Sequence, residues 1–336
     1  MTRHVGVGPY RSLEPYEVNA RRVLNRVPAR SRMPFRWTIN AYRGCAHACV
    51  YCFARPTHTY LGLGIGEDFE RRIVVKVNAV ERLEAELADP AWHGEAIAMG
   101  TNTDPYQKAE ARYHLTRGIV ELLGRRRNPF SILTKSTLIL RDLDVLVEGA
   151  RRTEVSLRLS IGTLDRDLWR LTEPGTPPPA QRVAALRRLR ESGLDCSVLI
   201  APVLPGLSDG AEQVGEVARA CVEAGATSVT AIPLHLRPGV REHFLSWLAQ
   251  VRPDLLDTYE ARFRGRAYQP AAEQDRLRAV VRAAVDQVRA SRGAPPAGVG
   301  RPAWRRARRP LAEPAPSRGP DGGSSPAPRC VQLQLF

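Results

Sequence analysis

Three cysteines lie within eight residues in Ala41-Tyr-Arg-Gly-Cys45-Ala-His-Ala-Cys49-Val-Tyr-Cys52-Phe-Ala-Arg-Pro56. Their spacing is Cys-x3-Cys-x2-Cys, with the aromatic residue Tyr51 directly before the third cysteine. Three thiolates can hold three irons of a four-iron, four-sulfur cluster and leave the fourth iron open to another ligand. We therefore predict that Cys45, Cys49 and Cys52 bind a [4Fe-4S] cluster with an open position for chemistry.

A zinc ion is the alternative occupant of this loop. Structural zinc takes four ligands, usually supplied as two pairs. His47 is available as a fourth ligand, but one short loop supplies four tetrahedral ligands poorly, and no second cysteine pair follows. Cys196 and Cys221 fall in a predicted strand and a predicted helix, where free cysteines are usually buried core residues. The spacing therefore favours the cluster over zinc.

Outward from this loop, short apolar runs alternate with helical patterns. The runs predicted as strands are residues 37–41, 73–77, 96–100, 130–133, 155–160, 197–201 and 228–232. The predicted helices are residues 79–87, 109–123, 143–151, 180–192, 210–224 and 241–248. Repeated strand–helix units indicate a parallel sheet covered by helices. Six or more units predict an α/β fold, a partial (β/α)6 barrel of the TIM type.

Polar residues follow several of the predicted strands, where such barrels carry their chemistry. They are Thr101, Asn102, Thr103, Asp104, Lys135 and Ser160. The oxygens of the first four suit an ammonium group, Lys135 can pair with a carboxylate, and Ser160 can bond a ribose or a carboxylate. Each alone is more simply a strand cap or a core residue. Together at successive strand ends they predict a cofactor-binding site.

The formal net charge of +15 is concentrated at the two ends of the sequence. Residues 1–36 and 290–336 each carry +6, and only +3 falls on the residues between them. Basic flanks attract polyanions such as nucleic acid, although arginine can equally be the solubilising residue of this chain. We expect a basic extension over residues 1–35, the barrel and C-terminal helices over 36–289, and a disordered Pro/Arg-rich tail over 290–336.

Neither a membrane span nor a signal peptide is expected. No run of 18 apolar residues occurs, and the first ten residues lack the apolar stretch of a secretory signal. These observations predict a cytoplasmic protein with reduced thiols. Hydrophobic residues make up 43% of the chain, which allows a sizeable core and excludes a wholly disordered protein.

The Cys-x3-Cys-x-aromatic-Cys loop, after the first strand of a predicted barrel, resembles that of the radical S-adenosylmethionine superfamily. The resemblance covers about residues 36–270. Within the superfamily, the chain resembles the branch that contains spore photoproduct lyase, and its actinobacterial members in particular. The segments that carry this likeness are Thr101-Asn-Thr-Asp-Pro-Tyr-Gln107, Thr134-Lys-Ser136, Arg141-Asp-Leu-Asp144, Glu173-Pro174 and Ala201-Pro-Val-Leu-Pro-Gly206.

This resemblance implies a mechanism and a set of partners. The cluster would cleave S-adenosylmethionine to a 5′-deoxyadenosyl radical, which takes a hydrogen atom from an unactivated carbon. Residues 101–104 would bind the methionine ammonium, Lys135 its carboxylate, and Tyr51 would pack at the cluster and the adenine edge. A DNA substrate, a role in DNA repair, and an electron donor such as flavodoxin or ferredoxin are implied as well.

Two departures from that lyase concern its hydrogen relay. The lyase uses a tyrosine directly after its third cluster cysteine, where this chain has Phe53, and a cysteine where this chain has Met99 and Gly100 before Thr101. The same relay is therefore not expected, and the reaction type, lyase or oxidoreductase, stays open. The alternatives are radical modification of RNA, a peptide or a small molecule, and a non-catalytic iron–sulfur module.

The last five residues, Gln332-Leu333-Gln334-Leu335-Phe336, resemble the peptide with which bacterial polymerases and repair proteins dock on the β sliding clamp. Leu335 and Phe336 would be apolar anchors and Gln332 a polar latch on a tether. The alternative is that the tail folds back onto its own barrel. An apolar end on a solvated tether favours docking on the clamp.

Three further sites are open at this stage. Glu173 and Arg182 bracket a Pro-rich turn, either as a buried pair near the cofactor or at a solvent-facing helix start. His58 and His235 can be substrate contacts, but lone histidines are usually structural or on the surface.

Overall fold

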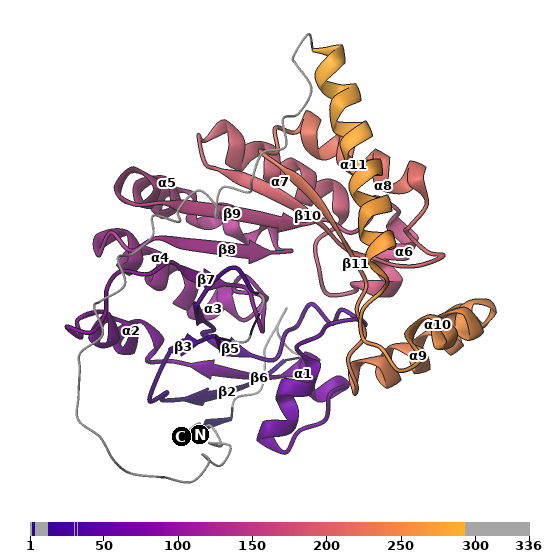
Figure 1. Ribbon diagram of the computed structural model, residues 1–336. Coiled ribbons are helices and arrows are strands. Elements are labelled where there is room, and N and C mark those ends of the chain that lie inside the picture. The colour runs from indigo at the N-terminus through magenta and orange to yellow at the C-terminus, as the bar shows by residue number, and fades with distance from the viewer. Residues whose placement is uncertain (1, 4–12, 30, 32, 293–336) are drawn as a thin grey trace, which may run out of the picture.

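The computed structural model describes residues 2–3, 13–29, 31 and 33–292 (Figure 1). Its larger sheet has the order β11-β10-β9-β8-β7-β4-β3. These strands are β3 (Leu24–Arg26), β4 (Trp37–Ile39), β7 (Ile97–Met99), β8 (Phe130–Thr134), β9 (Val155–Ser160), β10 (Cys196–Val203) and β11 (Val229–Pro233). Within this sheet, the neighbouring strands β4, β7, β8, β9, β10 and β11 are parallel and follow one another in chain order. The sheet stays open between β11 and β3, which confirms the predicted partial barrel.

Helices cover this sheet on its outer side (Figure 1). Five helices that the apolar pattern predicts do so: α2 (Ala79–Leu87), α4 (Leu115–Arg125), α5 (Leu143–Arg152), α7 (Pro179–Glu191) and α8 (Ala211–Glu223). The sixth predicted helix, α9 (Val240–Val251), forms apart from the sheet and packs against the short helices of residues 253–263. In α4, Leu115, Ile119 and Leu122 are buried at helical spacing, while Arg125 faces solvent. That one-sided apolar face is what holds such a helix against a sheet.

The single helix predicted over residues 109–123 is interrupted. A short α3 (Glu110–Tyr113) ends at His114, whose φ of 53° is left-handed, and α4 begins directly after it. The periodicity prediction was wrong at this point because the buried carboxylate of Glu110 accepts hydrogen bonds from the backbone N–H groups of Thr116 and Arg117, at 2.9 and 3.3 Å. These bonds cap α4 from outside its own first turn.

Several elements carry no clear sequence pattern. They are α1 (Glu67–Arg71), α6 (Arg166–Thr172), α10 (Leu256–Phe263), α11 (Ala271–Ser291) and the 3-10 helices η2 (Arg55–Leu61), η3 (Thr137–Asp142) and η4 (Pro253–Leu255). The long α11 packs against α8 and against β11, the strand at one edge of the sheet (Figure 1). Within the described part of the chain, every helix falls short of the length or apolarity that a bilayer-spanning segment needs.

The strand predicted over residues 73–77 forms, but outside the barrel. It is β6 (Arg72–Lys76), which lies in a four-stranded sheet of order β1-β2-β6-β5 with β1 (Thr2–Arg3), β2 (Glu14–Val18) and β5 (Tyr42–Arg43). The crossover helix between β4 and β7 is α2, which follows β6. The stretch from β5 to β6 is therefore an insertion in the first β/α unit, and it contains the cysteine loop.

The N-terminal segment belongs to both sheets. Within residues 1–35, β2 pairs with β6 and β3 pairs with β4. Glu86 on α2 accepts hydrogen bonds from the backbone N–H groups of Val23 and Leu24, at 3.0 and 2.8 Å. Val23 itself is fully buried. The described part of this segment is therefore built into the fold. Residues 293–336, including the proposed clamp-docking peptide, lie outside the described residues.

Replacing Glu86 should release the N-terminal segment. Glu86→Ala removes the side chain that receives the N–H groups of Val23 and Leu24, and leaving such groups unbonded costs about 1–3 kcal/mol. We expect a lower free energy of unfolding in urea and faster proteolysis before residue 24. Glu84→Ala is the matched control, since Glu84 lies on the same helix and is exposed. Equal stability of the two variants would contradict the assigned role.

Candidate active site

The cysteine loop is folded as a series of tight turns. The backbone N–H groups of Ala48, Cys52 and Arg55 donate to the carbonyls of Cys45, Cys49 and Cys52, at 3.3, 3.2 and 3.2 Å. Cys45 and Cys49 are buried, Cys52 is half-buried, and all three are free thiols. Burial raises the pKa of each thiol, that of Cys49 to about 12, and the charge of neighbouring thiols raises the pKa values of Cys45 and Cys49 further. The turns therefore gather three thiols in one apolar region.

This donor set fits an iron–sulfur cluster. The described residues contain no group of three or more His, Cys, Asp or Glu side chains arranged to hold a metal ion. His47, the fourth ligand that a zinc site would need, instead places Nδ1 at 3.3 Å from Asp104 Oδ2. A cluster binds its thiolates at separate irons, so it needs three nearby cysteines but no shared tetrahedral centre.

Two glycines allow the loop to lie where it does. Gly44 has φ of +82°, and a Cβ there would lie 2.9 Å from the Phe69 carbonyl oxygen. A Cβ on Gly175 would lie only 2.0 Å from the Ala46 carbonyl oxygen. Gly175 also donates its N–H to the His47 carbonyl at 3.1 Å. Close backbone approach at both places fixes the cysteine loop against the barrel.

A buried arginine braces the loop from behind. Arg55 is fully buried, and its Nε and Nη2 atoms donate to the Cys49 carbonyl at 3.0 and 2.9 Å. It also donates to the Ile65 carbonyl at 2.9 Å and pairs with Glu70 at 2.5 Å. The sequence analysis missed this role. The only signal was a position three residues after the last cysteine, which by itself does not separate a surface arginine from a buried one.

Residues 101–107 hold the loop at its other end. Thr103 and Gln107 both donate to the Gly44 carbonyl, at 2.6 and 3.0 Å, and Gln107 accepts from the Ala46 N–H at 3.0 Å. The Thr101 hydroxyl and the Asn102 N–H donate to Asn40 Oδ1, at 3.3 and 3.2 Å. Thr103 therefore supports the cysteine loop, while Thr101 and Asn102 bond the residue that precedes it, and the predicted contact of residues 101–104 with a ligand stays a prediction.

Asp104 is the most heavily bonded of these residues. Its carboxylate accepts from the Thr134 hydroxyl at 2.6 Å and from the backbone N–H groups of Lys135 and Tyr106, at 2.8 and 2.9 Å. Burial alone would raise the pKa of Asp104, but His47 and these donors lower it below its ordinary value. Asp104 is therefore a stable anion that joins the cysteine loop to the ends of β7 and β8.

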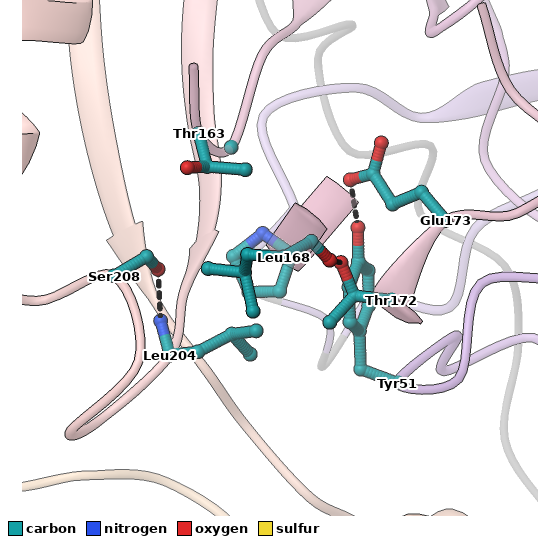
Figure 2. Close-up of a pocket in the computed structure, with 9 residues that line it drawn as sticks. Tyr51, Thr163, Leu168, Thr172, Glu173, Leu204 and Ser208 are labelled. Atoms are coloured by element: carbon teal, nitrogen blue, oxygen red, sulfur yellow. Dashed lines mark hydrogen bonds between the residues drawn. The ribbon is translucent and has the colours of Figure 1, made fainter. Parts of the chain in front are cut away.

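Glu173 brings together three residues that the sequence predicted separately. Lys135 Nζ donates to Glu173 at 2.8 Å and to Ser160 Oγ at 2.9 Å, and it lies 5.5 Å from the centre of the Tyr51 ring. Tyr51 donates its hydroxyl to the same carboxylate (Figure 2). Arg182 pairs with Glu173 at 2.5 Å, and both side chains are at least 95% buried. The interpretation of Glu173 and Arg182 as a buried pair is confirmed.

The charges in this group do not balance. Two cations, Lys135 and Arg182, face one carboxylate. Burial would raise the pKa of Glu173, but Arg182 and Lys135 hold it far below its ordinary range, so the carboxylate stays ionised. A partly buried surplus of one positive charge is costly unless an anion approaches it. The arrangement therefore suits a ligand with a carboxylate or phosphate group.

Two cavities border the site. The smaller one, of ≈ 10 Å³, lies between Tyr51, Glu173 and the strand ends at Gly162 and Pro202 (Figure 2). The larger one, of ≈ 480 Å³, lies beside His47 and is lined by Tyr106, Ser136 and the 174–177 turn. Its size falls in the range of small-molecule pockets.

His58 is buried, bonds the Arg72 carbonyl at 2.9 Å and packs edge-on against Phe69, so it is structural as expected.

Removing the charge of Glu173 should be severe. Glu173→Gln leaves Lys135 and Arg182 without a counter-ion, and breaking a buried ion pair costs about 3–5 kcal/mol. We expect a large loss of unfolding free energy in urea at neutral pH. Glu148→Gln is the control, because Glu148 pairs with Arg152 on the surface at 2.7 Å and such pairs contribute little. Similar losses in both variants would show that Glu173 is not the central counter-ion.

A family model and several sequence relatives match the chain. The model of the Radical SAM superfamily matches residues 39–221. An uncharacterized protein of Mycobacterium tuberculosis (strain H37Rv) is 44% identical over 278 residues, which are 83% of this chain and 82% of the relative. Another uncharacterized protein, of Methanocaldococcus jannaschii, is 32% identical over 181 residues, which are 54% of this chain and 65% of that relative.

The fold is similar to that of spore photoproduct lyase. The lyase complexed with dinucleoside spore photoproduct has a TM-score of 0.56 at 20% identity, over 77% of this chain and 75% of the lyase. A mutant lyase with bound AdoMet and the same dinucleoside has a TM-score of 0.56 at 19% identity, over the same shares of the two chains. At this identity the likeness concerns the fold alone. From its family match and its mycobacterial relatives, the chain belongs to the radical SAM superfamily, whose cofactors are a [4Fe-4S] cluster and S-adenosylmethionine.

Proposed function

We propose that this protein is a radical S-adenosylmethionine enzyme that acts on DNA. The observation that carries the proposal is a buried group of three thiols beside a polar network with a surplus positive charge. The thiols match the metal centre of the superfamily, and the surplus charge matches the carboxylate of its co-substrate. A closed structural metal site would need neither an adjacent cation nor a neighbouring cavity.

Cys45, Cys49 and Cys52 hold the cluster in this proposal. When bound, the cluster supplies the electron that cleaves S-adenosylmethionine to methionine and a 5′-deoxyadenosyl radical. The chain contributes a dry, rigid loop: Arg55 and Gln107 fix its backbone from two sides, and the apolar surroundings limit access of water and oxygen. The cytoplasm is the proposed location, because it keeps thiols reduced and supplies an electron donor such as flavodoxin or ferredoxin.

Lys135 and Ser160 bind the methionine carboxylate in the proposal. An incoming carboxylate would share Lys135 with Glu173, while Arg182 keeps Glu173 neutralised. Tyr51, in the cysteine loop itself, packs against this network and is proposed to contact the adenine edge. Thr101, Asn102, Thr103 and Asp104 remain the proposed ammonium-binding segment, and among them the exposed Asn102 side chain is the one best placed to reach a ligand.

DNA is the proposed substrate because two independent features favour a polyanion. The chain carries a formal net charge of +15, and the solved neighbour with the same fold is a lyase complexed with a dinucleoside lesion. Phe53 stands directly after the third cysteine and has no hydroxyl to relay hydrogen. The proposed reaction on DNA therefore differs in its hydrogen transfer from that of the lyase, and its type, lyase or oxidoreductase, is what product analysis must decide.

The test compares two cysteine variants under anaerobic conditions. Cys49→Ala should keep its circular dichroism spectrum but lose the cluster absorbance and all 5′-deoxyadenosine production. Cys221→Ala, a buried thiol of the core, should keep both. Damaged duplex DNA should increase 5′-deoxyadenosine production by the wild type. Cleavage that is indifferent to DNA would move the substrate to RNA, peptides or small molecules. No cleavage by a cluster-loaded protein would favour the non-catalytic module.

Docking on the β sliding clamp is a further part of the proposal and rests on residues 332–336 alone. Gln332, Leu333, Leu335 and Phe336 supply the polar latch and apolar anchors. The full chain should co-elute with the clamp, and a chain lacking residues 332–336 should not, while both cleave S-adenosylmethionine equally. Unchanged co-elution after the deletion would remove the clamp from the proposal.

A further inference from the structure

Three aromatic rings pack in a row that begins in the cysteine loop. The ring centres of Phe53 and His235 lie 5.9 Å apart, with the rings tilted by 36°. Those of His235 and Tyr268 lie 5.4 Å apart, and these two rings are stacked with an interplanar angle of 18°. Phe53 follows Cys52 directly, His235 follows the end of β11, and Tyr268 stands between α10 and α11. We call Phe53, His235 and Tyr268 the aromatic platform.

The platform stands on a fixed backbone. The Leu236 N–H donates to the Ala267 carbonyl at 2.8 Å, and Gln269 Nε2 donates to the Leu234 carbonyl at 3.1 Å. These bonds hold the segment after β11 beside the segment before α11. Leu234 and Leu236 are buried in the same apolar cluster as Cys49. The platform is therefore attached to the core beneath the cysteine loop.

The outer rings are not needed to fill that core. Phe53 is 46% exposed and Tyr268 is 58% exposed, whereas the leucines beneath them are buried. Phe53 and Tyr268 both pack against His235 and are each about half exposed, so they leave apolar ring surface for a ligand. Burial and the charge of Arg237 lower the pKa of His235, so its ring is neutral at physiological pH and adds no charge to the stack.

Three arginines lie near Tyr268, one through a hydrogen bond and two in the residues just before it in the chain. Arg237 donates to the Tyr268 hydroxyl at 2.8 Å, and Arg264 and Arg266 are exposed on the turn that leads to Tyr268. Within the described residues, none of these three arginines has an ion pair with an acidic side chain. Exposed arginines next to stacked rings are the combination that binds single-stranded nucleic acid, with bases on the rings and phosphates on the guanidinium groups.

We propose that the aromatic platform binds an unpaired nucleobase of a DNA strand, and that Arg237, Arg264 and Arg266 bind the phosphates next to it. The inference rests on the proposed function, which supplies DNA as the substrate, and names where the strand lies. Phe53 is the residue next to Cys52 in the chain. A base stacked on the platform would therefore place the neighbouring nucleotide close to the cysteine loop. The base must leave the duplex to stack in this way, so damaged or single-stranded DNA is the expected ligand.

The test separates stacking from charge. A fluorescent oligothymidine of about 12 nucleotides is compared with an abasic strand of the same length and charge, using the full-length, cluster-loaded protein. The wild type should bind oligothymidine more tightly. Tyr268→Ala should weaken that binding by about 5-fold to 100-fold and leave abasic binding unchanged. Tyr60→Ala is the control, because Tyr60 is 78% exposed on η2 and has no ring partner among the described residues.

Each outcome decides a different question. Equal binding of Tyr268→Ala and wild type, or an equal loss in Tyr60→Ala, would overturn the platform. So would a loss of affinity by Tyr268→Ala for both strands. Tighter, ring-dependent binding of oligouridine would assign the platform to RNA and overturn the DNA assignment. If the wild type cleaves S-adenosylmethionine but binds oligothymidine no more tightly than the abasic strand, only the platform is overturned. If it binds oligothymidine more tightly but does not cleave S-adenosylmethionine, only the proposed function is overturned.

Discussion

The carboxylate of Glu173 is the contact on which the arrangement of the site depends. It accepts from Tyr51 in the cysteine loop and Lys135 at the end of β8, and it pairs with Arg182 on α7. A buried carboxylate is tolerated only when such partners surround it. Each partner is thereby drawn to one point, and the loop, the sheet and a covering helix take a single relative position. Because Lys135 and Arg182 share this one carboxylate, the group carries one positive charge in excess. The same contact therefore both positions the site and gives it a preference for an anionic ligand.

A second constraint acts on the opposite end of the loop. Thr103 and Gln107 bond the Gly44 carbonyl, and Asp104 holds His47. Thr103 and Asp104 therefore support the loop, and their contact with a ligand stays a prediction. Such support is chemically reasonable, because three cysteines that hold a cluster need rigid neighbours. Lys135 and Ser160 are the side chains proposed for the carboxylate of the co-substrate.

The sequence was sufficient for the barrel, since its strands depend on local patterns. Apolar runs marked β4, β7, β8, β9, β10 and β11. Spacing marked the three cysteines, which stay the predicted cluster ligands. Pairing partners were beyond such patterns: β6 reads like a barrel strand but joins β2 and β5. The break at His114 depends on the side chain of Glu110, and the bracing by Arg55 depends on burial. Lys135, Tyr51 and Ser160 were identified one by one, but their meeting at Glu173 requires contacts between distant segments.

The two residues that flank Cys52 show how the loop separates its two tasks. Tyr51 is 8% exposed and faces the polar network inside the barrel, whereas Phe53 is 46% exposed and belongs to the aromatic platform outside it. The residues directly before and after Cys52 therefore lie in two different environments. A cofactor held on the Tyr51 side and a substrate held on the Phe53 side would meet at the cysteine between them. Since Phe53 has no hydroxyl, its contribution on the substrate side is a stacking surface, and hydrogen transfer there falls to other groups.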